Sequence, residues 1–147
     1  MSRFSLPTKP DHYKLSQETA DAAVVELLAY YEIDVDEIPE DQRSVFAANL
    51  AKLSRYYRMG LLENVRGNDG TLSVKQHLQT PPGDVRELVY GRMTGAVKLT
   101  MDAFPPTAFY ARTHALMGAL CQTPMLDKLE GNDHSVVECL GLVFLAG

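Results

Sequence analysis

The sequence has few cysteines, little excess of either charge and no long hydrophobic run. Cys121 and Cys139 are its two cysteines, which suits a reducing compartment where thiols serve as small core residues. The net charge of −5 argues against a non-specific nucleic-acid binder and against docking on anionic membranes. No apolar run approaches the roughly 18 residues that span a bilayer, and residues 1–12 lack an apolar core of signal-peptide length. We therefore expect a cytoplasmic protein that binds neither nucleic acid nor membrane.

The sequence also lacks the spacing of a catalytic, cofactor or metal site. Its four histidines are far apart in the chain: His12, His77, His114 and His134. No pair has a helical metal-ligand spacing such as His-x-x-x-His. His114 follows Tyr110 by four residues, which predicts a packed or capping histidine on a core face. The acidic run 34–41 lacks the Gly and Glu of a calcium loop and is typical of a helix N-terminus. We expect a protein without catalytic residues, cofactor or metal.

Hydrophobic periodicity predicts a mainly α (α+β) fold, with about five helices around a small antiparallel β-hairpin or sheet near residues 61–91. No repeat, low-complexity tract or linker interrupts the chain, so residues 1–147 are interpreted as a single domain. Within it, residues 1–12 are expected to form an extended arm, residues 13–60 an N-terminal helical pair, and residues 61–147 a hairpin followed by helices.

Individual boundaries follow from caps and turns. Ser16 is expected to cap a helix over residues 16–32, and Pro39 to open a second helix over residues 39–59. Leu72–His77 alternates apolar and polar residues like a half-buried strand. Turn signals at Asn68-Asp-Gly70 and Pro81-Pro-Gly-Asp84 bound this strand, with neighbouring strands expected at residues 61–65 and 85–90.

Helical periodicity resumes after Gly91. Three apolar residues line one face of the next expected helix: Val97, Met101 and Phe104. Pro105-Pro106 closes that helix and opens another, whose apolar face is marked by Phe109, Leu116 and Leu120. Ser135-Val-Val-Glu138 fits the capping box that begins a helix, and it predicts the start of the final one.

Two features point to protein contact. The adjacent pairs Tyr30-Tyr31 and Tyr56-Tyr57 cannot face one way on a helix, so one tyrosine of each should lie near the surface, either in a partner contact or at the core boundary. The C-terminal segment is apolar almost all round, and a helix of this kind is either deeply buried or packed against another subunit. We favour self-association or a partner, with these candidate surface residues: Tyr30, Tyr31, Tyr56, Tyr57, Val136, Val143, Phe144 and Leu145.

The second half resembles the tail assembly chaperones of tailed bacteriophages. In residues 71–95, a strand, a Pro-containing turn and a second strand lead into Arg92-Met-Thr-Gly95, which stands where the family has a short Arg-x-Pro-Thr-like step. Downstream, Ala115–Leu120 is similar to the family's helix ending near a Leu-x-Gly. A short Pro/Leu segment, an Asp-started helix and the terminal Phe144-Leu145 complete the pattern. The resemblance covers about residues 71–147, and two additional helices precede it.

This resemblance implies a non-enzymatic phage protein that coats the tape-measure protein, recruits tail-tube subunits and leaves the finished tail. It also implies a helix-rich fold with a small β element, self-association into a homo-oligomer, and a place in the host cytoplasm. An alternative is a virion structural protein (a tail-completion, connector or baseplate component) that stays in the particle, and an arm such as residues 1–12 would suit it. A small enzyme using Cys121 or Cys139 with a histidine is a third hypothesis.

Overall fold

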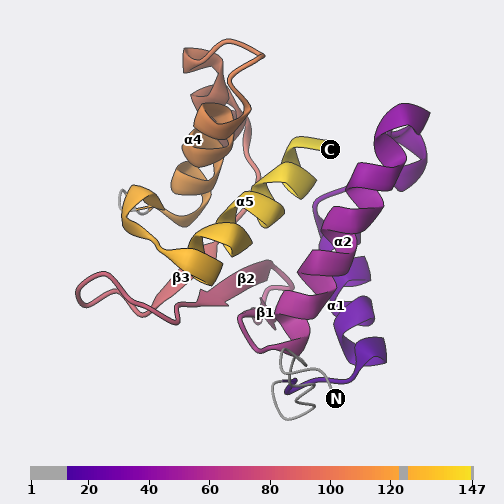
Figure 1. The fold of residues 1–147 in the computed structure, drawn as a ribbon, viewed down its shortest axis with the longest axis vertical. Helices are drawn as coiled ribbons and strands as arrows, with labels where there is room; N and C mark the ends of the chain where they lie inside the picture. The colour runs from indigo at the N-terminus through magenta and orange to yellow at the C-terminus, as the bar shows by residue number, and fades with distance from the viewer. Residues whose placement is uncertain (1–12, 123–125, 147) are drawn as a thin grey trace, which may run out of the picture.

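The computed structural model describes residues 13–122 and 126–146, which form five α-helices and one three-stranded antiparallel sheet (Figure 1). This confirms the mainly α (α+β) fold. The expected arm over residues 1–12 lies outside the described residues. The main elements are α1 (Gln17–Tyr30), α2 (Arg43–Arg58), β1 (Leu62–Arg66), β2 (Leu72–His77), β3 (Glu87–Tyr90), α3 (Gly95–Leu99), α4 (Phe109–Cys121) and α5 (Gly131–Ala146). Short 3₁₀ turns are η2 (Val35–Glu37), η3 (Glu40–Gln42), η4 (Thr100–Ala103) and η5 (Leu126–Lys128).

The two N-terminal helices pack against each other as the predicted pair. The Ser16 hydroxyl accepts a hydrogen bond from the Thr19 N–H at 3.2 Å, which confirms Ser16 as the N-cap of α1. The second helix begins later than expected, because residues 40–42 form η3 before α2 starts at Arg43. The reason is local: no side chain caps this end, and the Gln42 N–H bonds the Pro39 carbonyl three residues back, which tightens the first turn.

The sheet has the strand order β1-β2-β3, with both pairs antiparallel. Its central strand shows the predicted alternation: Leu72, Val74 and Gln76 are buried, while the residues between them are partly exposed. Gly70 takes a φ of +83° in the first turn, as its position in Asn68-Asp-Gly70 predicted. The third predicted strand is present as β1, one residue later than expected.

The segment before Pro105 is less regular than predicted. A single helix with Val97, Met101 and Phe104 on one face was expected, but the structure has five residues of α3 followed by η4. Phe104 is extended, with φ −124° and ψ 146°, because the ring of the following Pro105 disfavours helical backbone at the residue before it. Phe104 therefore turns away from the helix axis and is exposed.

The final helix also begins earlier than predicted. Its first residue is Gly131, and the Ser135 hydroxyl donates to the Gly131 carbonyl inside the helix, so the capping-box interpretation is wrong. The acidic residue that stabilises this end is Asp133, which is 1% exposed. Its carboxylate accepts the backbone N–H groups of Gln79 and Thr80, each at 2.8 Å, and so ties the helix to the loop after β2.

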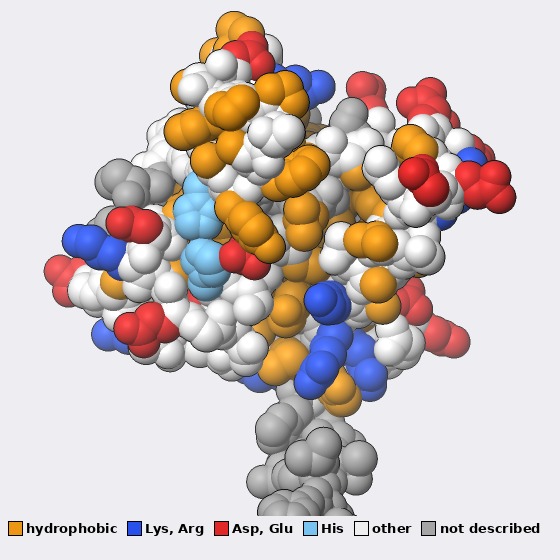
Figure 2. Space-filling view, turned by 45° about the horizontal axis from the view of Figure 1, so that its top comes forward, with side chains coloured by type: hydrophobic (Ala, Val, Ile, Leu, Met, Phe, Trp, Pro, Cys, Tyr) orange, Lys and Arg blue, Asp and Glu red, His pale blue; other side chains and the backbone are white. Residues whose placement is uncertain are grey.

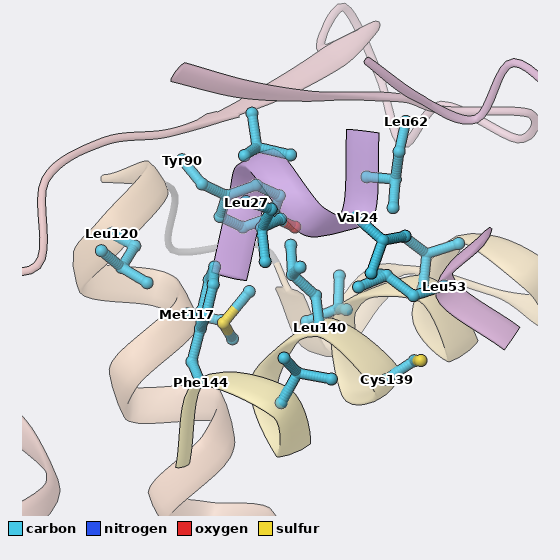
Figure 3. Close-up of a cluster of buried hydrophobic side chains, with 14 of the residues drawn as sticks. Val24, Leu27, Leu53, Leu62, Tyr90, Met117, Leu120, Cys139, Leu140 and Phe144 are labelled. Atoms are coloured by element: carbon cyan, nitrogen blue, oxygen red, sulfur yellow. The ribbon is translucent and has the colours of Figure 1, made fainter. Parts of the chain in front are cut away.

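One buried cluster contains side chains from both halves of the chain. Leu27, Leu53, Met117 and Leu140 meet there, each from a different helix (Figure 3). Figure 1 shows α5 lying between α4 and the α1–α2 pair, and its contacts with both neighbours agree. The N-terminal helices therefore pack on the C-terminal half and do not form a separate arm.

Candidate functional site

The predicted tyrosine surface is only partly present. Tyr30, Tyr31 and Tyr56 are half-buried, but Tyr57 is 1% exposed and its hydroxyl donates to Asn64 Oδ1 at 2.6 Å. Burial raises the pKa of Tyr57 well above its usual value. Tyr57 is therefore a core residue, and its prediction as a contact residue is wrong. The prediction that one tyrosine of each adjacent pair lies near the surface is confirmed for Tyr56-Tyr57, since Tyr56 is partly exposed.

The C-terminal helix is buried within the chain itself. Val136, Val143 and Phe144 are at most 5% exposed, and Leu145 is partly buried. The ring centroid of Phe144 lies 4.5 Å from that of Tyr31, whose hydroxyl donates to the Gly91 carbonyl at 2.7 Å. The prediction of a partner surface at Val136, Val143 and Phe144 is therefore wrong. Packing against α2 and α4 explains the apolar sequence of α5 without another subunit.

Exposed hydrophobic side chains gather instead around the start of α4. Phe109 is 62% exposed and Tyr110 69% exposed, with Leu99 and Phe104 exposed nearby. Figure 2 shows hydrophobic side chains gathered on this face. Leu116 and Leu120 lie on the buried face of this helix as predicted, but Phe109, predicted to lie there with them, is exposed. Large exposed hydrophobic surfaces of this kind are typical of protein-contact sites.

A groove of about 700 Å³ runs along the same helix. Phe104 and Tyr110 line one end, and Gln122 and Leu126 the other. Its floor consists of small residues of α4 spaced by four, three and one: Ala111, Ala115, Gly118 and Ala119. Small side chains at helical spacing let another helix approach closely. The spacing of these small residues can be read from the sequence. It predicts a groove only when the structure shows that the opposite face of α4 is the buried one.

His114 lines this groove and meets a second histidine. Its Nε2 lies 3.0 Å from His134 Nε2, and His134 Nδ1 lies 3.1 Å from Glu138 Oε1. The sequence interpretation that the histidines do not converge is therefore wrong for this pair, because α4 and α5 bring together residues twenty positions apart. His77 lies elsewhere, on the sheet, with Glu63 Oε1 2.7 Å from its Nε2.

The two cysteines occupy different environments. Cys139 is 5% exposed and its Sγ donates to the Asn49 carbonyl at 3.3 Å, while Cys121 on α4 is half-buried. Burial raises the pKa of the Cys139 thiol to about 11. A nucleophilic cysteine needs a thiolate near neutral pH, so the geometry of Cys139 is that of a structural core residue.

We expect iodoacetamide at pH 8 to modify Cys121 at least about tenfold faster than Cys139, because a thiol with a pKa of about 11 is only about one part in a thousand thiolate at that pH. Peptide mass spectrometry over a time course measures both rates in one sample. Unfolding in urea should remove the difference. Equal rates in the folded protein would contradict the buried position of Cys139.

Within the described residues, none of the helices combines the length and apolar character that crossing a membrane requires. Comparison of the chain with protein-family models, with curated proteins and with solved structures finds no match. The candidate site is therefore defined by its own geometry: an open apolar groove along α4, with aromatic side chains at one end and His114, which meets His134, in its wall.

Proposed function

We propose that this protein is a non-enzymatic tail assembly chaperone of a tailed bacteriophage. It would hold the tape-measure protein and tail-tube subunits in the host cytoplasm until the tail forms. The observation that carries the proposal is the apolar groove along α4, which lies inside residues 71–147, the part of the chain that resembles these chaperones. The client is inferred from the resemblance, and the groove is the surface to which we propose that the client binds.

The groove suits an amphipathic helix as its occupant. A helix that lies in a groove buries its apolar face, and the small side chains of Ala111, Ala115 and Gly118 leave room for its backbone. Exposed rings at Phe109 and Tyr110 can anchor the helix at one end, since aromatic residues contribute strongly to protein interfaces. A tape-measure protein, long and helical, offers such segments repeatedly.

The groove is open to one side, which suits a client that must later be released. An interface along one short helix buries less area than a permanent complex does, so the contact is expected to be moderate in strength. Tube subunits assembling around the tape measure can then displace the chaperone.

The test is co-expression with the tape-measure and tail-tube proteins of the same phage, followed by size exclusion with light scattering. We expect co-elution with the tape measure, and at least tenfold less co-eluting client for Tyr110→Ser. The matched control is Val45→Ser on α2, which removes a similarly exposed hydrophobic residue (64%, against 69% for Tyr110) far from the groove. The control should bind like the wild type.

Analysis of purified virions, added to this experiment, separates the alternative. A protein that ignores both clients but is present in purified virions would be a structural component of the tail, and the chaperone proposal would be wrong. Light scattering of the protein alone also measures self-association, which the resemblance implies.

A further inference from the structure

Three side chains from two helices converge beside the groove, and one of them, His114, lines it. His114 comes from α4, and His134 and Glu138 come from α5. One nitrogen of each histidine and one carboxylate oxygen of Glu138 all lie within 4.8 Å of one another. Figure 2 shows two adjoining histidine side chains on this face, so solvent reaches the cluster.

We propose that these residues form a binding site for a divalent transition-metal ion, with Zn²⁺ as the representative. Imidazole nitrogens favour zinc, copper and nickel, whereas magnesium and calcium require oxygen ligands. In a tetrahedral zinc site, Zn–N bonds of about 2.0–2.1 Å place two ligand nitrogens about 3.3 Å apart. The Nε2 atoms of His114 and His134 are 3.0 Å apart, close to this spacing, and His114 would carry its proton on Nδ1 when its Nε2 binds the ion.

Glu138 gives His134 the correct tautomer for this role. A carboxylate only accepts hydrogen bonds, so the contact of 3.1 Å requires the proton of His134 to lie on Nδ1. The lone pair is then on Nε2, which faces His114. A carboxylate that orients a metal-binding histidine in this way is a recurrent feature of zinc sites, and Glu138 is therefore a positioning residue that also supplies negative charge.

The site spans α4 and α5, so an ion bound there links the two helices. A ligand that binds the folded but not the unfolded chain raises stability, and the gain grows with the logarithm of its concentration once that exceeds the Kd. The unfolded chain holds His114 and His134 twenty residues apart, which leaves no preformed site. Zinc should therefore raise the melting temperature, and this consequence does not depend on the proposed client.

The chain contains a natural comparison for this cluster. His77 lies between two carboxylates, with Glu63 Oε1 2.7 Å from Nε2 and Glu87 Oε2 3.8 Å from Nδ1. The Nε2 atom of His77 therefore faces a carboxylate, whereas the Nε2 atom of His134 faces the Nε2 atom of a second histidine. His77 thus provides an imidazole beside carboxylates without a second imidazole nitrogen at ligand spacing.

The experiment uses the full chain without a histidine tag, treated with chelator and dialysed. Isothermal titration with ZnCl₂ should show one saturable site, and melting curves should rise with Zn²⁺ but not with Mg²⁺. We expect His134→Ala to weaken zinc binding at least tenfold and Glu138→Gln about tenfold. His77→Ala should bind like the wild type. Circular dichroism in chelator checks that each variant is folded.

A measurement on the wild type keeps the test independent of folding defects. Histidine ring signals in ¹H–¹⁵N spectra should shift on zinc addition for His114 and His134 and stay in place for His77. Absence of saturable zinc binding would overturn the proposal, as would shifts at His77 alone or equal affinity for Mg²⁺. A wild-type protein that binds zinc but not the tape-measure or tail-tube protein would contradict only the chaperone proposal.

Discussion

Replacing Asp133 with alanine is expected to lower the free energy of unfolding by about 3 kcal/mol, because a buried carboxylate with two charge-assisted hydrogen bonds is removed. Its two oxygens accept the N–H groups of Gln79 and Thr80, and both donors lose their partner in the variant. The carboxylate also lies in the first turn of α5, where negative charge favours the helix dipole.

The same residue connects the sheet to the helix through its backbone. Gln76, fully buried in β2, donates from Nε2 to the Asp133 carbonyl at 2.8 Å and accepts the Tyr90 hydroxyl at 2.6 Å. Loosening the start of α5 therefore disturbs a buried polar chain as well. Buried networks of this kind are costly when only part of their hydrogen bonds remains.

Urea unfolding followed by circular dichroism measures the effect. Asp133→Asn should lower the free energy of unfolding less than Asp133→Ala does, because the asparagine side chain keeps one acceptor oxygen. It should still be less stable than the wild type, because its NH₂ group faces a backbone N–H group. Asp102→Ala, which removes an exposed carboxylate from η4, should change stability by less than about 0.5 kcal/mol. A similarly small change in Asp133→Ala would show that its two hydrogen bonds contribute little.

The second large effect is expected at Gly141, in the middle of α5. A Cβ atom there would overlap the Cγ2 atom of Thr113 on α4 and lie 3.2 Å from Met117 Cγ. Thr113 cannot move easily, since it is 1% exposed and its branched side chain is stiff in a helix. Gly141→Ala should therefore destabilise the protein by about 2 kcal/mol, despite the better helix propensity of alanine.

A double-mutant cycle isolates the cause. Thr113→Ala removes the obstructing methyl group, together with a buried hydroxyl that has no hydrogen-bond partner among the described residues. The cost of Gly141→Ala should fall by at least about 1 kcal/mol in that background. Gly95→Ala is the control, because a Cβ atom there meets nothing within 4 Å. Additive effects of Gly141 and Thr113 would contradict a direct overlap.

Local patterns predicted most elements because their causes are local. The apolar spacing of residues 20–31 and the Ser16 cap are sufficient for α1, and the alternation of residues 72–77 for β2. The start of α5 was misplaced because Ser135 and Glu138 match a capping box in sequence. The carboxylate that ties down this end instead binds N–H groups more than fifty residues away.

The candidate site could be predicted only in part. Tyr30, Tyr31, Tyr56 and Leu145 retain some exposure, while Tyr57, Val136, Val143 and Phe144 are in the core. The sequence of an apolar helix does not show whether the helix packs against its own chain or against a partner subunit. The groove was missed for the reverse reason, because Phe109 and Tyr110 look like core residues until the packing of α4 is known.

The helical character, the three-stranded sheet with its turns, and the inward-facing residues of most elements could be predicted from sequence patterns, because these features depend on neighbours a few positions apart. Tertiary structure alone decided that α5 is covered on both sides by its own chain, that one face of α4 stays open, and that His114 meets His134. Each of these depends on how α2, α4 and α5 pack, and the packing arises from contacts between residues far apart in the sequence.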